Sequence, residues 1–224
     1  APVASPLQPS PALAGALRDA YASKLAAFVR RFGGETKLVR LTINAQPLFV
    51  SAIHWVLRGV AKKGASFEDM SIPGGNATVQ EVTLMGSAVA PGYDTTPAID
   101  SPSGLLAVLT PSAFDAAADK KSLLEALAAA DNPTKSAPDT VPCIACHATS
   151  VLTKARATAA GIDPTTLAAR YASTYDLSIA AGKSATTDRT LRALGWLGKD
   201  PMISQRVAND TAQVLTELAA RFPQ

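Results

Sequence analysis

Residues 143–147 read Cys-Ile-Ala-Cys-His, and the rest of the chain is organised around this stretch. It contains both cysteines of the 224-residue chain and one of its two histidines, the other being His54. With two residues between the cysteines, one turn of chain places both sulfur atoms on the same side of the chain. The imidazole of the next residue then lies close to them. Two thiols and one imidazole are therefore expected at a single surface.

The pattern C-x-x-C-H is the attachment signature of haem c. The two thiols add across the vinyl groups of the haem, and the adjacent imidazole becomes an axial ligand of the iron. We therefore predict one covalently bound haem c, attached at Cys143 and Cys146, with His147 as the proximal iron ligand.

Three other uses of closely spaced cysteines fit the sequence less well. A thioredoxin-like redox pair requires a βαβ context and has no use for His147. A structural zinc ion needs about four ligands, and His54 is the only histidine or cysteine outside the motif. A disulfide that closes so short a loop would constrain little of the unfolded chain.

The composition predicts a folded protein without a nucleic-acid partner. Hydrophobic residues make up 47% of the sequence, charged residues 17%, and the formal net charge is +3. This balance is typical of a globular protein. The sequence lacks the dense stripe of Lys and Arg with interleaved aromatic residues that would predict nucleic-acid binding. No apolar run approaches 18 residues, which predicts no transmembrane segment in this sequence.

The first residues suggest an exported protein. Residues 1–11 contain four prolines and no charge, which is typical of an extended spacer. The sequence begins at Ala1, as a mature protein does after signal cleavage, and haem c is attached outside the cytoplasm in bacteria. We therefore expect a periplasmic or otherwise exported bacterial protein, whose precursor could be tethered to the membrane.

A helix is predicted from Pro11 to Phe32, with Ser10 as its cap and Gly33-Gly34 as its end. Apolar residues recur within it at three- and four-residue steps and predict one packing face. The members of that face are Leu13, Leu17, Tyr21, Leu25, Phe28 and Phe32.

Residues 37–110 predict a small antiparallel sheet with long loops. The runs 38–44 and 79–85 alternate between apolar and polar residues, as half-buried strands do. Between them, Leu48 to Val60 is a longer β-branched and aromatic run, and turn-rich stretches separate the three.

Residues 111–224 predict helices. One is expected over 111–131, with Leu123, Leu124 and Leu127 on its packing face. Gly161 is expected to end the helix of the motif, and Asp163-Pro164 to begin another. A last helix is predicted from Pro201 to about Phe222. Its predicted buried stripe is Ile203, Val207, Val214, Leu218 and Phe222.

These elements predict an α+β fold in which a β-rich N-terminal region packs on a mainly helical C-terminal half. Three parts are expected. Residues 1–36 form the proline-rich leader and the N-terminal helix, residues 37–110 the β-rich region, and residues 111–224 the helical domain that binds haem c.

The motif at Cys143, Cys146 and His147 resembles that of the c-type cytochromes, and a single copy implies a mono-haem member. The resemblance implies a cytochrome c-like haem-binding half, electron transfer and a redox partner protein. Two features depart from small cytochromes c. About twelve residues separate the helix 111–131 from Cys143, and Met202 follows Pro201 instead of preceding a proline. Sheet-rich haem proteins of the c′-β type also place strands first, but their motif lies close to the C-terminus.

The sixth iron ligand decides between two functions. Imidazole and thioether are the usual side-chain ligands, and the candidates are Met202, His54, Met70 and Met85. Met202 is preferred because it lies downstream of the motif, and His54 is the main alternative.

A sixth ligand from the protein predicts an electron carrier rather than an enzyme. An open position predicts a five-coordinate haem protein that binds a small molecule, as a peroxidase-like enzyme or a gas sensor. A haem-bearing docking subunit, in which the β-rich region recognises a partner, is a third class. The sequence does not predict an oligomeric state.

Overall fold

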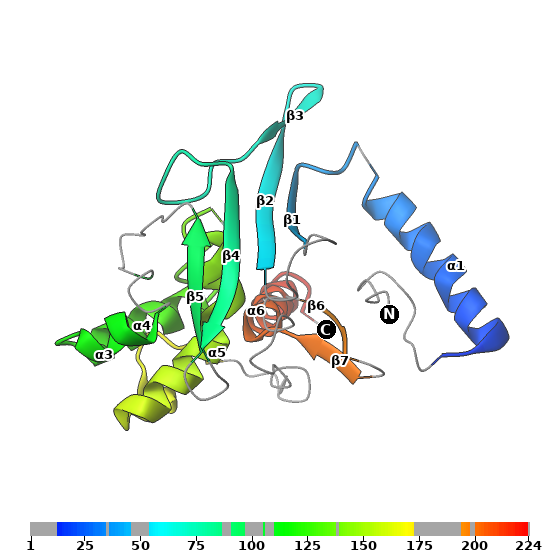
Figure 1. Cartoon of the computed structure of the whole chain (residues 1–224). Coiled ribbons are helices and arrows are strands. Elements are labelled where there is room, and N and C mark those ends of the chain that lie inside the picture. The colour runs from blue at the N-terminus through cyan, green and yellow to red at the C-terminus, as the bar shows by residue number, and fades with distance from the viewer. Residues whose placement is uncertain are drawn as a thin grey trace.

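The structure is a computed structural model and describes residues 13–34, 36–45, 54–86, 91–96, 105, 110–137, 139–172, 194–197 and 200–223. An antiparallel sheet occupies the N-terminal half of these residues, and helices dominate the C-terminal half (Figure 1). The predicted mixed fold with strands first and helices second is therefore confirmed. In the described residues, no helix is long and apolar enough to cross a membrane.

Strands and helices follow one another in a simple order. The strands are β1 (Arg40–Ala45), β2 (His54–Lys63), β3 (Ser66–Asp69), β4 (Val79–Gly86), β5 (Pro91–Thr96), β6 (Leu194–Leu197) and β7 (Asp200–Ile203). The helices are α1 (Gly15–Phe32), α3 (Pro111–Ala116), α4 (Lys120–Ala130), α5 (Cys143–Ala160) and α6 (Gln205–Arg221), with the 3-10 helix η1 (Pro164–Thr166).

The main sheet has the order β1-β2-β4-β5, and β3 extends β2 as a hairpin. Its pairs are antiparallel, with Leu41 opposite Val60 and His54 opposite Thr83. The alternating runs at 38–44 and 79–85 correspond to β1 and β4, so both strand predictions are confirmed. The run 48–60 corresponds in part to β2, and its residues before 54 lie outside the described residues.

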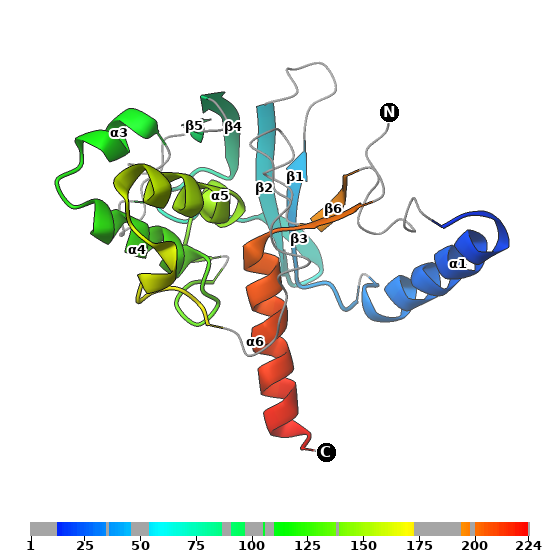
Figure 2. The same cartoon turned by 90° about the horizontal axis from the view of Figure 1, so that it is seen from below.

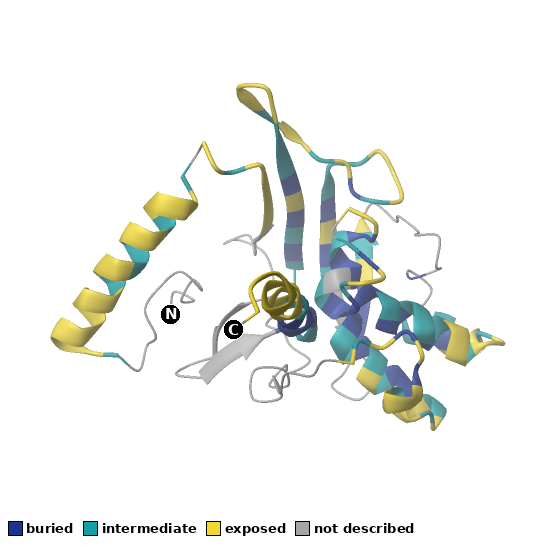
Figure 3. Cartoon of the chain, turned by 180° about the vertical axis from the view of Figure 1, so that it is seen from behind, coloured by how far each residue is buried: buried dark blue, intermediate teal, exposed yellow. Residues whose placement is uncertain are grey.

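The two faces of the sheet differ because successive side chains of a strand point to opposite sides. The inner face carries Trp55, Leu57, Val82 and Tyr93, which are buried in one core with α4 and α5. Leu124, Leu127, Ile144 and Leu152 supply the helical side of that core. Figure 3 shows the buried residues gathered where the strands meet these helices. Each such apolar side chain contributes about 1.5–3 kcal/mol when fully buried.

The N-terminal helix begins later than the sequence predicts. Ser10 and Pro11 lie outside the described residues, and Ala14 is extended. Gly15, the first residue of α1, has φ of +55°, outside the right-handed helical region. The helical backbone therefore does not continue from Gly15 toward Ala14. Its predicted apolar face is present but does not pack as expected, because no residue of α1 is buried.

The predicted helix 111–131 is two helices, α3 and α4. Ala117 is extended, and the carboxylate of Asp119 accepts a hydrogen bond from the Ser122 backbone N–H at 2.9 Å. An aspartate that caps in this way begins a new helix, which the single periodic pattern did not reveal. Asp163-Pro164 begins only the single turn η1 instead of a full helix.

The last helix begins at Gln205 instead of Pro201. Residues 200–203 form β7, which pairs with β6, and the hydroxyl of Ser204 accepts from the Val207 N–H and caps the helix. The predicted buried stripe is wrong for its last three members, while Val207 is half-buried and the side chain of Ile203 lies outside the description. The buried residues of α6 are Arg206, Ala208, Asn209 and Ala212, while Val214, Leu218 and Phe222 are exposed.

Gly161 ends α5 as predicted, with φ of +65°. Its N–H bonds to the Thr158 carbonyl, and the Ile162 N–H bonds to the Ala157 carbonyl. A Cβ at this glycine would meet no atom within 4 Å, so the preference for glycine here is conformational and not steric.

We predict that Gly161→Ala lowers the free energy of unfolding by about 1–2 kcal/mol, because an L-residue with a Cβ is strained in the left-handed region. Gly161→Asn should cost less, since asparagine tolerates that conformation. Urea unfolding of the three proteins measures both differences. Equal stability of the alanine variant and the parent would contradict the assigned end of α5.

Candidate functional site

The motif occupies the first turn of α5, where positions 143, 146 and 147 share one face because they are three and four residues apart. The residues between the two cysteines, Ile144 and Ala145, are buried in the core. Cys143 and His147 are half-buried. Cys143 itself packs against the edge of this core, so the motif begins at the margin of the core.

Gln80, on the inner face of β4, holds the start of α5. Pro142 precedes the helix and offers no side-chain cap. Instead, the Oε1 atom of Gln80 accepts a hydrogen bond from the Ile144 backbone N–H at 3.2 Å. Gln80 is fully buried, and its Nε2 has no hydrogen-bond partner within the described part of the chain. A buried donor without an acceptor lowers the free energy of unfolding by about 1–3 kcal/mol. The Gln80 amide beside the motif therefore carries such a destabilising group.

The thiol of Cys143 is free, and burial raises its pKa above the usual range. Catalytic C-x-x-C pairs have the opposite property, because their nucleophile needs a lowered pKa. The pairs of the main sheet are antiparallel and contain no parallel βαβ unit among the described strands. Both observations argue against a thioredoxin-like redox site.

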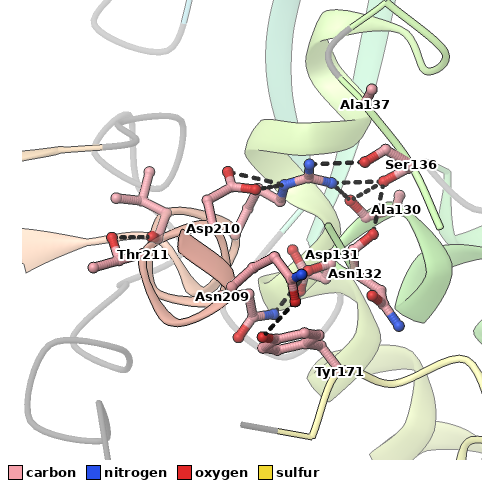
Figure 4. Close-up of polar contacts among 12 residues, drawn as sticks. Ala130, Asp131, Asn132, Ser136, Ala137, Tyr171, Asn209, Asp210 and Thr211 are labelled. Atoms are coloured by element: carbon pink, nitrogen blue, oxygen red, sulfur yellow. Dashed lines mark hydrogen bonds and ion pairs between the residues drawn. The ribbon is translucent and has the colours of Figure 1, made fainter. Parts of the chain in front are cut away.

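Arg206 of α6 binds the chain segment that leads into the motif, and its partners Ala130, Ser136 and Asp210 are labelled in Figure 4. Its guanidinium donates to the Ala130 carbonyl at 2.7 Å, to the Ser136 hydroxyl at 2.6 Å and to the Ser136 carbonyl at 2.9 Å. The carboxylate of Asp210 lies 3.0 Å from its Nε. These hydrogen bonds therefore connect the start of α6 to the turn between α4 and Cys143.

Asp131, at the end of α4, connects three helices. Its Oδ1 accepts from the hydroxyl of Thr149 on α5 at 2.6 Å, and its carbonyl accepts from the Asn209 side chain on α6 at 2.7 Å. Asp131 is buried, and this desolvation raises its pKa to about 6, while the Thr149 hydrogen bond and the charge of Arg206 act in the lowering direction. The network thus holds α5 two residues beyond His147.

His54 does not lie near the motif. It is on the outer face of the sheet, where its Nδ1 is 3.3 Å from the Thr83 hydroxyl and its Nε2 is 3.5 Å from the Glu81 carboxylate. The inner face, which contacts α5, carries its neighbour Trp55. The sheet therefore separates His54 from His147, and the structure does not bring these two imidazoles together.

The methionines are placed less fully. Met202 lies on β7 opposite Gly195, and Met85 lies on β4 opposite Gly92, but their side chains are outside the description. The sulfur of Met70 packs over Gly59 on β2. Met70 follows β3, which lies at the end of the sheet distant from α5 in Figure 1. The prediction that Met202 begins a helix is wrong, because it belongs to a strand.

Among the described side chains, no three of His, Cys, Asp or Glu gather where they could hold a metal ion. A structural zinc site requires such a gathering. A haem iron does not, because the motif supplies only one ligand to it.

Sequence reasoning did not find Gln80, Asp131 and Arg206. For Gln80 a signal exists, because it shares the parity of Val82 and therefore points inward. Arg206 had no such signal: the helix was predicted to start at Pro201, with an apolar stripe buried in place of this cation.

The chain matches no family model, no curated protein and no solved structure.

The raised pKa of Asp131 predicts a pH dependence of stability. Its folded value of about 6 exceeds the ordinary 3.8, so between about pH 4 and 6 the folded state holds a proton that the unfolded state has lost. The free energy of unfolding from this group then falls as the pH rises through that window, by roughly 3 kcal/mol. Asp131→Asn keeps an oxygen acceptor for Thr149 and removes this titration.

Urea unfolding of parent and Asp131→Asn between pH 4 and 7 tests this. We expect the variant to gain stability relative to the parent as the pH rises. Parallel pH profiles for the two proteins would show that Asp131 does not titrate in this window.

Proposed function

We propose that this chain is a mono-haem c protein that carries single electrons between redox partners. Cys143 and Cys146 form the thioether links, and His147 is the proximal iron ligand. The observation that supports the proposal is that positions 143, 146 and 147, which include every cysteine of the chain, lie three and four residues apart in the first turn of α5, where Cys143 and His147 are only half-buried.

The residues present fit the prosthetic group by their chemistry. Two thiols and an imidazole in the C-x-x-C-H spacing are what attachment requires. Cys143 and His147 are half-buried, with Cys143 at the margin of the core, whereas Ile144 between them is fully buried. When bound, haem c supplies an iron that cycles between its ferrous and ferric states.

The protein's own contribution is a fixed frame for the motif. Gln80 holds the first turn of α5, Arg206 holds the turn before it, and Thr149 is held by Asp131. A site supported in this way keeps His147 and the two cysteines in one geometry. Such rigidity suits an electron carrier, whose oxidation state changes without a change in bonding partners.

The exported location and the redox partner belong to the same proposal. Haem c is attached outside the cytoplasm in bacteria, so a periplasmic or exported site follows from the motif. An electron carrier needs a protein that delivers or accepts the electron.

The alternative is a five-coordinate haem protein that binds a small molecule. The placement of His54 favours it, because the second histidine of the chain lies across the sheet from the motif. If Met202 does not reach the iron either, the sixth position is open to an external ligand.

The first test of the proposal is covalent attachment. Expression of the chain in a bacterial periplasm with haem c maturation should add the mass of one haem, which resists extraction by acidified acetone. The double variant Cys143→Ser/Cys146→Ser is the control and should carry none. An unmodified mass for the parent, from a host that matures another cytochrome c normally, would overturn the proposal.

The second test concerns the sixth ligand. With Met202 bound, the ferric protein should show the near-infrared sulfur-to-iron band, and Met202→Ala should remove it and lower the potential. His54→Ala should leave the spectrum unchanged, since His54 lies on the other side of the sheet. A high-spin parent that binds carbon monoxide readily would replace electron transfer by the five-coordinate alternative.

A further inference from the structure

Helix α1 exposes an apolar face that nothing in the described chain covers. Leu17, Tyr21, Phe28 and Phe32 are 67%, 49%, 61% and 56% exposed, and α1 has no buried residue. Figures 1 and 2 show α1 standing apart from the sheet and the other helices. The four residues share one side of the helix because they are spaced by four, seven and four positions.

The polar remainder of α1 is basic. It contains four basic residues and one acidic residue, Asp19, which gives a net charge of +3. Lys24 and Arg31 lie beside Leu17 and Phe28 on a helical projection, so they border the apolar face.

A second uncovered apolar surface lies on the outer face of the main sheet, on its edge strand. Val39, Leu41 and Ile43 are 68%, 42% and 46% exposed. Leu41 pairs with Val60, which is half-buried on the same face. Exposed apolar residues on an edge strand invite association with another chain.

Acidic residues continue this outer face beyond its apolar part. Glu81 on β4 and Asp94 on β5 have the outward parity, since Thr83 pairs with Asp94 and also with the outward His54. Both carboxylates are exposed, and neither β4 nor β5 contains a lysine or arginine. The outer face also carries two cations of β2, Arg58 and Lys62, and the carboxylate of Asp69, which pairs with Arg58 at 2.6 Å. With Glu81 and Asp94 it therefore has three acidic and two basic residues, a net charge of −1 opposite the net +3 of α1.

We propose that two copies of this chain form a dimer by exchanging α1, each helix lying on the outer face of β1 and β2 of the other copy. The connection after α1 favours the other copy over its own sheet. Lys37 and Leu38 donate their N–H groups to the Gly34 carbonyl in a turn. With this turn formed, α1 leaves the edge of its own sheet and projects away from it (Figure 2).

The exchange covers enough area for a stable dimer. Large side chains bury about 150–250 Å² each when fully covered, so the partly exposed four on α1 supply roughly 400 Å² and the opposing sheet a similar area. Two such contacts related by a twofold axis bury roughly 1,600 Å², the size of a standard stable interface.

Other occupants explain less. An anionic membrane would cover the basic, apolar α1 but would leave Leu41 and Ile43 exposed. The exposed end of α6 also has apolar residues, among them Leu218 and Phe222. However, α6 has two basic and two acidic residues and so offers no excess negative charge to α1.

The experiment uses the full chain with a photo-reactive benzoylphenylalanine in place of Phe28, together with sedimentation of the unmodified protein. We expect a dimer in solution and, after irradiation, a product of twice the chain mass whose linked peptides fall within 39–60. A monomer that crosslinks within its own chain, crosslinks to 214–222, or binding to anionic phospholipid vesicles without dimerisation would each overturn the proposal.

Variants separate the interface from folding. Phe28→Ser/Phe32→Ser should weaken the dimer by roughly 100-fold or more and leave the urea midpoint of the monomer unchanged, because neither residue is buried. Ala20→Ser/Ala27→Ser, away from the apolar face, should dimerise as the parent does. Ile43→Arg should weaken the dimer from the sheet side, and an unaffected dimer in this variant would also overturn the proposal.

Discussion

The buried guanidinium of Arg206 is the interaction on which the arrangement of the C-terminal half depends. Removing a cation from water costs several kcal/mol unless its donors find partners. Here three acceptors from residues 130–136 and the carboxylate of Asp210 surround it. The chain between α4 and α5 must therefore adopt the one path that presents those acceptors to α6. That path ends at Cys143, so the placement of the motif follows from a helix far along the sequence.

A second constraint is the division of α5 into two faces. Ile144, Ala148 and Leu152 enter the core, and Cys143 of the motif packs against its edge. The same turn therefore contributes to the core and contains the motif. Gln80 of β4 accepts a hydrogen bond from the first turn of α5, since the proline before the helix provides no side-chain cap. The candidate site is thus defined by contacts from three elements, β4, α5 and α6, and not by the motif alone.

Much of this could be predicted from the sequence where the signal is local. The alternation at 38–44 and 79–85 identified two strands, and Gly161 identified the end of α5. The failures concern information that is not local. Asp119 and Ser204 cap helices at sites the longer pattern concealed. The face on which His54 lies depends on strand register. The spacing of apolar residues in α6 could not reveal that the buried polar groups of this helix are the guanidinium of Arg206 and the amide of Asn209.

The shared core has a consequence for how the protein unfolds. Trp55, Leu57 and Val82 belong to the same cluster as Leu124 and Leu152, so the cluster spans the boundary near residue 110 between the strand-rich and helical parts. Neither part retains a complete core without the other. A chain of this kind gains and loses its structure as one cooperative unit, in which a defect anywhere in the sheet raises the frequency with which the first turn of α5 opens. Retention of the motif's geometry is thus a property of the global stability of the molecule and not of one helix.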